Sequence, residues 1–361
     1  MYLYIFLIFL VLFISILPKL FGGNYSNKIS MIVIIVLSSL MPAFRDITIG
    51  TDTYAYVEMF KKDYSYLEWL ENGTELGFAF CIKLLQSFGF NNYFNYLLFF
   101  SILFNYLIIS TIYKISKNIP LSLMAFLSFS TLYLFHFNVL RQSIALAFFV
   151  YSLPYIFSKQ YFKTYVCIFL AFLFHYSAGL LFVFPIVYGF LKDRFYTVSA
   201  LSTLSLYIYT KLTIVFTLFL GNAIGSDRYS SYDNQTTANA SGKIFLFNFF
   251  ILFLVYLFSL FTKLKDDLEF RFFNYLMLLM VVTNFCITYL GLKYEGPGRI
   301  LSYFYCGLIF IFPYLASVFR SESRVVVNIL LIAFQLLYIL FLINMSNLHE
   351  VFPYKINNFL S

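Results

Sequence analysis

Apolar runs of about membrane-crossing length follow one another along this chain, from its first residues to about residue 345. A helix needs about 20 mostly apolar residues to cross the hydrocarbon core of a bilayer with all its backbone groups bonded internally. We therefore predict an all-α polytopic membrane protein, a single integral-membrane domain over residues 1–361. It has about 12 transmembrane helices, with approximate cores at 2–17, 29–44, 93–113, 120–137, 142–158, 163–177, 179–191, 195–220, 244–262, 272–291, 300–319 and 325–345.

Composition excludes the other broad classes. The chain is 61% hydrophobic and only 11% charged, whereas a soluble globular protein has about 25% charged residues. A disordered chain and a collagen are excluded by the same figures. The four cysteines show no metal-ligand spacing, so no metal site is predicted.

The net charge of +8 could indicate a nucleic-acid partner. However, the basic residues gather in short loops near residues 19–28, 114–117, 159–163, 192–194, 263–271 and 320–324. The positive-inside rule places these loops in the cytoplasm and both termini outside. We therefore predict the lipid bilayer, and no nucleic acid, as the environment of these charges.

The opposite side carries the two long polar segments, at about 45–89 and 221–243. Within the first, Leu76–Leu85 is apolar but too short to span, which predicts a re-entrant or interfacial helix. Because elaborated loops usually carry function, we expect the chemistry on this outer side.

Arg141 is the first candidate site residue, at the outer start of the run 142–158. Its guanidinium and the unpaired N–H groups of a helix start would together hold a phosphate. Asn138 and Gln142 flank it, which favours a ligand site over an arginine that reaches lipid headgroups.

A second candidate follows Arg45, where Gly50-Thr51-Asp52-Thr53-Tyr54 predicts a tight turn and then a helix start. Asp52 either caps that helix or belongs to an anion-binding region. His175, near the outer end of the run 163–177, either bonds two helices together or contacts a diphosphate or a proton donor.

Two further arginines lie on the outer side. Arg299 follows Gly296-Pro297-Gly298, which predicts a place in the first turn of a helix, and Glu295 is a base or a partner of Lys293. Arg228 lies in the second outer segment, where a solvated loop arginine paired with Asp227 is the simpler interpretation. Tyrosine rings beside these charges are candidates to contact a sugar: Tyr54, Tyr176, Tyr229 and Tyr294.

Several of these segments, in this order, make the chain resemble the EpsG family of Wzy-type polysaccharide polymerases. They are Arg45 with Gly50–Tyr54, Glu75-Leu76-Gly77-Phe78, Asn138–Ala145, Phe174–Ala178 and the late Arg299. The resemblance runs from about residue 40 to 320 and implies a GT-C-like glycosyltransferase bundle. The Arg228 loop has no counterpart that we align.

The resemblance implies polymerisation of undecaprenyl-diphosphate-linked oligosaccharide repeat units into O-antigen or a related polysaccharide. It implies the periplasmic face of the bacterial inner membrane, no cofactor or metal, and a Wzz-type chain-length regulator and a flippase as partners. We expect Arg141 and Arg299, with Arg45 or Arg228, at the diphosphates. Asp52, Glu75 or His175 would orient or deprotonate the acceptor.

Three alternatives stay open at this point. An O-antigen ligase would use similar outward arginines with a different acceptor, and such enzymes typically carry a larger outer loop late in the chain. A lipid-linked oligosaccharide flippase or other transporter would show charges through the midplane and pseudo-symmetric halves. A structural or acyl-transfer membrane protein is the third.

Overall fold

The computed structural model of the chain describes residues 1–21, 24–90, 92–224, 238–293, 297–345 and 350–357. Its regular elements in these residues are helices, and an isolated β-bridge joins Arg45 to Ile356. Seven helical segments of the described chain are long and apolar enough to cross a membrane: Ser26–Ala43, Tyr93–Ile115, Leu140–Phe157, Gly242–Leu260, Leu268–Tyr289, Gly298–Ser317 and Ser321–Ile343. The predicted all-α polytopic membrane fold is confirmed.

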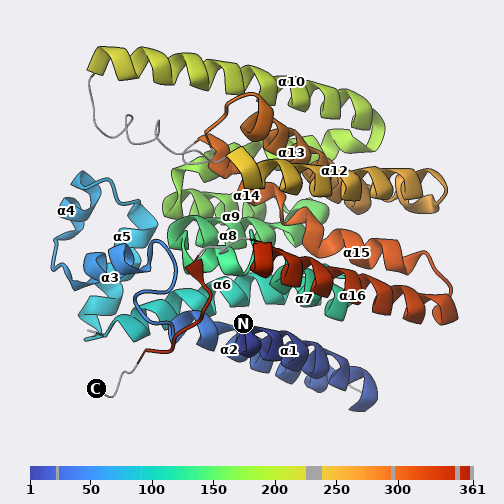
Figure 1. Ribbon diagram of the computed structural model, residues 1–361, viewed down its shortest axis with the longest axis horizontal. Helices are drawn as coiled ribbons and strands as arrows, with labels where there is room; N and C mark the ends of the chain where they lie inside the picture. The colour runs from blue at the N-terminus through green and yellow to red at the C-terminus, as the bar shows by residue number, and fades with distance from the viewer. Residues whose placement is uncertain (22–23, 91, 225–237, 294–296, 346–349, 358–361) are drawn as a thin grey trace. The chain divides into compact units, whose positions relative to one another are not determined.

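The chain forms two compact units, Met1–Phe182 with Phe319–Ser361, and Val183–Val318. That these two units act as the single domain expected from the sequence stays a prediction. The helices of the first unit (Figure 1) are α1 Tyr2–Phe21, α2 Asn24–Ala43, α3 Thr53–Lys61, α4 Tyr66–Glu71, α5 Leu76–Ser87, α6 Tyr93–Ile115, α7 Ile119–Ser128, α8 Leu140–Phe157, α9 Tyr161–Phe174 and α16 Ser321–Met345.

Side-by-side packing of apolar helices builds the core of the first unit. α6 packs against α2 and α8, α8 packs against α9, and α7 packs against α1 and α16. Polar side chains begin the helices where the loops end: Asn92 accepts from the backbone of Phe94, and Asn118 does the same for Leu121. These side chains satisfy N–H groups that have no partner inside the helix.

The predicted span at 120–137 is not one helix. α7 ends at Ser128, and a short 3-10 helix follows at Leu134–Phe137. The residues between them are almost entirely buried among other side chains. Irregular backbone is tolerated at membrane depth where protein covers it, which explains how the helix can end here.

The second unit comprises α10 Phe184–Ile224, α12 Ala238–Leu260, α13 Leu268–Tyr289, α14 Leu301–Phe304 and α15 Gly307–Ser317. α13 packs against the other four. α10 is interrupted at Arg194, whose backbone is non-helical at φ −130° and ψ 35°. The two predicted spans at 179–191 and 195–220 therefore meet at a kink.

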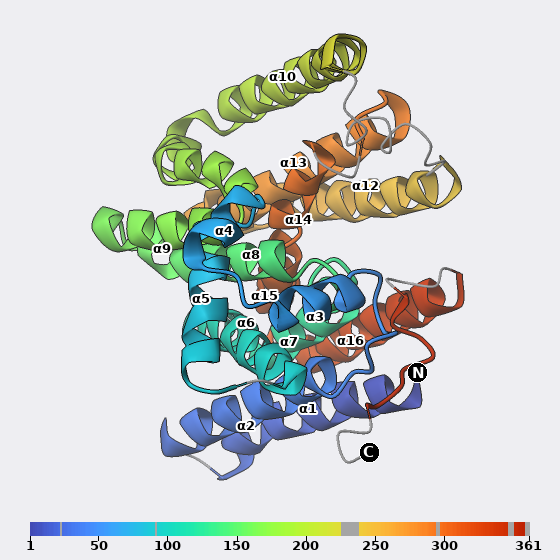
Figure 2. The ribbon, with the colours of Figure 1, turned by 90° about the vertical axis from the view of Figure 1, so that its left-hand side faces the viewer.

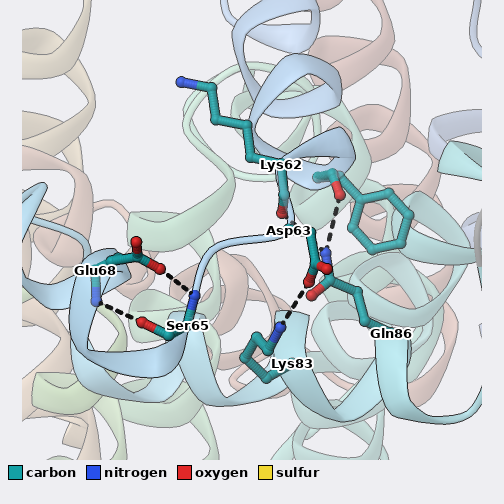
Figure 3. Close-up of polar contacts among 7 residues, drawn as sticks. Lys62, Asp63, Ser65, Glu68, Lys83 and Gln86 are labelled. Carbon is teal, nitrogen blue, oxygen red and sulfur yellow. Dashed lines mark hydrogen bonds and ion pairs between the residues drawn. The ribbon is translucent and has the colours of Figure 1, made fainter.

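The first outer segment folds into α3, α4 and α5, which lie together in both views (Figures 1 and 2). Polar contacts hold the three helices in place (Figure 3): the Gln86 amide donates to the carbonyls of Phe60 and Lys62, and Lys83 pairs with Asp63 at 3.1 Å. Ser65 and Glu68 form a reciprocal capping box that starts α4. The predicted short helix at 76–85 is α5.

A strap formed by residues 350–357 lies along the start of this outer segment. The Asp46 N–H donates to the Lys355 carbonyl at 3.0 Å, and the Gly50 N–H donates to the Glu350 carbonyl at 3.1 Å. The Tyr354 hydroxyl donates to the carbonyl of Met41 at 2.6 Å. The strap thus ties the end of the chain to the end of α2, which the sequence did not reveal.

Candidate functional site

Glu75 lies at the centre of a cluster of polar side chains in the first unit. It is the N-cap residue of α5, and only 5% of its surface is exposed. One carboxylate oxygen, Oε2, accepts a hydrogen bond and forms an ion pair with Nη1 of Arg141. The other, Oε1, lies 3.4 Å from Nδ1 of His175. One buried carboxylate therefore joins residues from three separate segments.

Arg141 is the second residue of α8, so the prediction that it lies in the first turn of a helix is confirmed. Its side chain remains 29% exposed, and its guanidinium also lies over the ring of Phe78 at 5.9 Å. The guanidinium donates to the hydroxyl of Tyr56 on α3 as well. Burial raises the pKa of Tyr56, which keeps this hydroxyl neutral beside the arginine.

His175 ends α9, and its extended backbone (φ −157°) directs the chain into the following 3-10 helix, Tyr176–Val183. Its approach to Glu75 depends on how closely α5 and α9 pack. A β-carbon added to Gly77 would lie 3.0 Å from the carbonyl oxygen of Leu173. A glycine at this position therefore permits the contact between the two helix ends.

Asp52 takes the N-cap position of α3, but its side chain makes no capping hydrogen bond to that helix. The Thr51 hydroxyl donates to it instead, at 3.1 Å. Asp52 is half-buried and lies one helical turn before Tyr56, on which its charge acts. Asp52 thus lies near enough to Tyr56 for its charge to act on the Tyr56 hydroxyl.

A tight turn at Gly50 packs the segment before α3 closely against the segment before α8. Gly50 has φ +87°, and a β-carbon there would lie 2.3 Å from Oδ1 of Asn138. The Thr53 hydroxyl meets the carbonyls of Ile49 at 2.6 Å and Phe137 at 3.3 Å. Both segments that the sequence singled out are therefore packed against each other.

Arg45 is fully buried, with 0% of its surface exposed. Its Nε donates to the Thr53 hydroxyl at 3.0 Å, its Nη1 donates to the Pro42 carbonyl at 2.9 Å, and its guanidinium lies 5.3 Å from the Phe137 ring. Burial lowers the pKa of Arg45 to about 10, so the group stays charged at neutral pH. Arg45 is enclosed by protein, where it joins the end of α2 to the start of α3, and its expected place at a diphosphate stays a prediction.

A family model described as the EpsG family matches residues 28–356 of the chain. The chain belongs to the EpsG family. This family comprises Wzy-like polymerases, so the protein is a multi-pass membrane protein of a glycosyltransferase-like polymerase family. No curated protein sequence and no solved structure matches the chain.

The other predicted site residues of this EpsG-family protein lie in several environments. Asn138 and Gln142 are buried beside Arg141, at 3% and 0% exposure. Tyr54 and Tyr176 are exposed, at 60% and 49%. Arg228, Tyr229, Tyr294 and Glu295 lie outside the described residues.

Arg299 belongs to the second unit. It lies in the 3-10 helix Pro297–Ile300, which leads into α14, so the helical first turn expected here is a 3-10 turn. The Gly298 N–H donates to the Lys293 carbonyl at 2.9 Å, and a β-carbon on Gly298 would lie 2.7 Å from that oxygen. A close backbone approach thus sets the position of Arg299.

Sequence reasoning missed two features of this candidate site. Tyr56 was not singled out, although its spacing of four residues from Asp52 was a usable signal. The second is a buried network at the start of α8, in which His136 contacts the Ser143 hydroxyl through Nδ1 at 2.7 Å and the Ser101 hydroxyl through Nε2 at 3.2 Å. Its three members lie on separate elements, so no local pattern predicted it.

Proposed function

We propose that the protein polymerises undecaprenyl-diphosphate-linked oligosaccharide repeat units into O-antigen or a related polysaccharide. The reaction takes place on the periplasmic face of the bacterial inner membrane and needs no metal. Membership of a Wzy-like polymerase family supports the reaction class. The observation that carries the residue assignment is the Glu75 carboxylate between Arg141 and His175.

The proposed transfer joins the growing glycan to an incoming repeat unit. An acceptor hydroxyl oxygen bonds to the anomeric carbon of the growing chain while the bond from that carbon to the diphosphate oxygen breaks. The electron pair leaves with undecaprenyl diphosphate, and the hydroxyl proton goes to the protein. Negative charge on the leaving group therefore grows as the bond breaks.

In this proposal Arg141 stabilises the leaving diphosphate. A guanidinium held in place by Glu75, Tyr56 and the Phe78 ring needs little reorganisation when charge develops next to it. Its partly exposed side chain leaves donor groups within reach of a ligand. The N–H groups at the start of α8 add a second attraction for an anion.

Glu75 and His175 are the proposed proton acceptors, because a carboxylate next to an imidazole can take a proton from an acceptor hydroxyl and pass it on. Asp52, next to Tyr56, orients the acceptor sugar in this scheme. We assign Arg45 to positioning rather than to ligand contact, since it is fully buried. The roles of Arg299 and Arg228 at a diphosphate stay predictions.

Deletion of the gene, followed by electrophoresis of the surface polysaccharide, tests the function. A polymerase predicts loss of the ladder of chain lengths with a single repeat unit still attached to the lipid A core. Polymer that stays on its lipid carrier would instead indicate a ligase. Repeat units trapped in the cytoplasm would indicate a flippase, and both results would overturn the proposal.

Complementation of the deletion strain with Arg141→Ala tests the residue assignment. We expect single repeat units in place of long chains, and little rescue by Arg141→Lys, because an ammonium group cannot replace the guanidinium fork. Arg320→Ala, at an exposed arginine between α15 and α16, is the matched control and should restore the ladder. A normal ladder from well-expressed Arg141→Ala would refute the assignment.

A further inference from the structure

The second unit contains a cavity of about 290 Å³ where α12 turns into α13. Residues from the kink in α10, the last turns of α12 and the first turns of α13 line it. Its lining includes the cations Lys192, Lys265 and Arg271 and one carboxylate, Asp193. These residues form a cavity with an excess of positive charge, which we call the basic cavity.

The three cations of the basic cavity have different tasks. The Arg271 guanidinium donates to the backbone carbonyls of Leu191, at 3.3 Å, and Lys192. These carbonyls lie just before the kink at Arg194. Arg271 therefore satisfies backbone groups that the interrupted helix leaves open and holds the kink in place.

Lys192 and Lys265 are exposed. Within the described parts of the chain, neither has a carboxylate at ion-pairing distance, whereas Arg271 lies 3.9 Å from Asp266. The two ammonium groups are therefore available to an external anion.

A second cavity of about 320 Å³ continues from the basic cavity. The two share Phe195, Tyr196, Tyr256 and Asn274 in their linings. The second is otherwise almost entirely apolar, and its lining reaches from Tyr256 back to Phe249 along α12. From Phe249 to Leu260 the two cavities follow α12 for about 16 Å at 1.5 Å per residue. That length equals about one leaflet of a hydrocarbon core about 30 Å thick.

A basic end that continues into an apolar groove of leaflet depth matches one class of ligand. We propose that these joined cavities bind an anionic lipid, with its phosphate between Lys192 and Lys265 and its hydrocarbon tail along α12. The segments that carry these lysines, residues 192–194 and 263–271, are among the basic segments that the positive-inside rule assigns to the cytoplasm. The ligand is thus a lipid of the cytoplasmic leaflet, and its site shares no residue with the Glu75–Arg141–His175 cluster.

Binding to the full-length protein in detergent tests the proposal. Phosphatidylglycerol and phosphatidylcholine of equal chain length are titrated, and bound lipid is counted by native mass spectrometry. We expect tighter binding of phosphatidylglycerol. A lysine at a membrane surface is worth about fivefold in affinity for an anionic lipid, so Lys192→Ala/Lys265→Ala should weaken it roughly 30-fold.

Matched variants separate this site from general surface charge. Lys28→Ala/Lys263→Ala removes two exposed lysines that do not line the basic cavity, and it should leave the affinity unchanged. Asp193→Asn removes the carboxylate from the lining and should tighten binding several-fold. This gain cannot arise from misfolding.

Three results would overturn the proposal. The first is equal affinity of the wild-type protein for the two lipids, and the second is an unchanged affinity in Lys192→Ala/Lys265→Ala. The third concerns the tail. If glycerol phosphate, which has none, displaces the lipid at the concentration where phosphatidylglycerol itself binds, the cavity takes a free phosphate rather than a lipid.

Discussion

Gly77 lies so close to Leu173 that a β-carbon at residue 77 would be 3.0 Å from the Leu173 carbonyl oxygen and 3.1 Å from its Cβ. The contact joins the first turn of α5 to the last turn of α9. Glu75 immediately precedes α5, and His175 ends α9. The absence of a side chain at one residue thus determines how near a carboxylate comes to an imidazole.

Gly77→Ala is expected to push the start of α5 away from α9, because the neighbouring atoms are the carbonyl group and the Cβ of Leu173, which the backbone holds in place and which cannot rotate aside. Overpacking of this kind costs about 1–3 kcal/mol, and the shift should reduce polymer formation by separating Glu75 from His175. The free energy of unfolding and the polysaccharide ladder measure the two effects.

Gly189→Ala is the control for this change, since that glycine on α10 has no atoms within 4 Å of an added β-carbon. It should be neutral or stabilising by up to about 1 kcal/mol. Equal behaviour of the two variants would contradict the packing explanation.

Glu75→Gln keeps the shape of the side chain and removes its charge. We expect a loss of polymerisation of about 10²–10⁴-fold, the contribution typical of a positioned acid or base, because the amide cannot accept a proton at neutral pH. Turnover of a lipid-linked repeat unit by the purified protein is the measurement. Glu71→Gln, at an exposed residue of α4, should retain wild-type turnover. Wild-type turnover in Glu75→Gln would exclude this carboxylate as the base.

Arg45→Ala is expected to destabilise the first unit by about 2–4 kcal/mol, since it removes two charged hydrogen bonds and leaves a buried void. The stability of Arg45→Lys should lie between the stabilities of Arg45→Ala and the wild type, because one ammonium group replaces the guanidinium fork that reaches both Pro42 and Thr53. Thermal unfolding in detergent measures both, with Arg320→Ala as the exposed control. An unchanged midpoint in Arg45→Ala would show that this residue does not hold the two helices together.

Tyr354→Phe tests the strap at residues 350–357. It removes the hydrogen bond from the Tyr354 hydroxyl to the Met41 carbonyl, which is worth about 0.5–1.5 kcal/mol. A chain that stops at residue 349 loses every strap contact and should be destabilised further. Tyr161→Phe, at an exposed tyrosine on α9, should unfold like the wild type. If the truncated chain also unfolds like the wild type, the strap contributes nothing to the stability of α2 and α3.

The class of fold could be predicted from the sequence because each apolar run, taken by itself, indicates a membrane-spanning helix. A run of about 20 apolar residues that faces lipid must form a helix, because lipid offers its backbone groups no hydrogen-bond partner. The same local logic placed Arg141 in the first turn of a helix and Asp52 at the start of another. The prediction of a helix was wrong at residues 120–137, where other segments bury the chain and so allow an irregular backbone. No local sequence pattern indicates such burial.

The partners of each charged side chain depended on the tertiary structure. Arg45 and Arg141 look alike in sequence, as outward arginines at helix ends, but one is enclosed by Pro42, Thr53 and Phe137 and the other meets Glu75 with part of its surface exposed. Hydropathy predicts how deep in the membrane a residue lies, because this depth depends on the apolar and polar residues on either side of it in the chain. Which helices touch depends on the close packing of side chains from distant segments, as at Gly77 and Leu173.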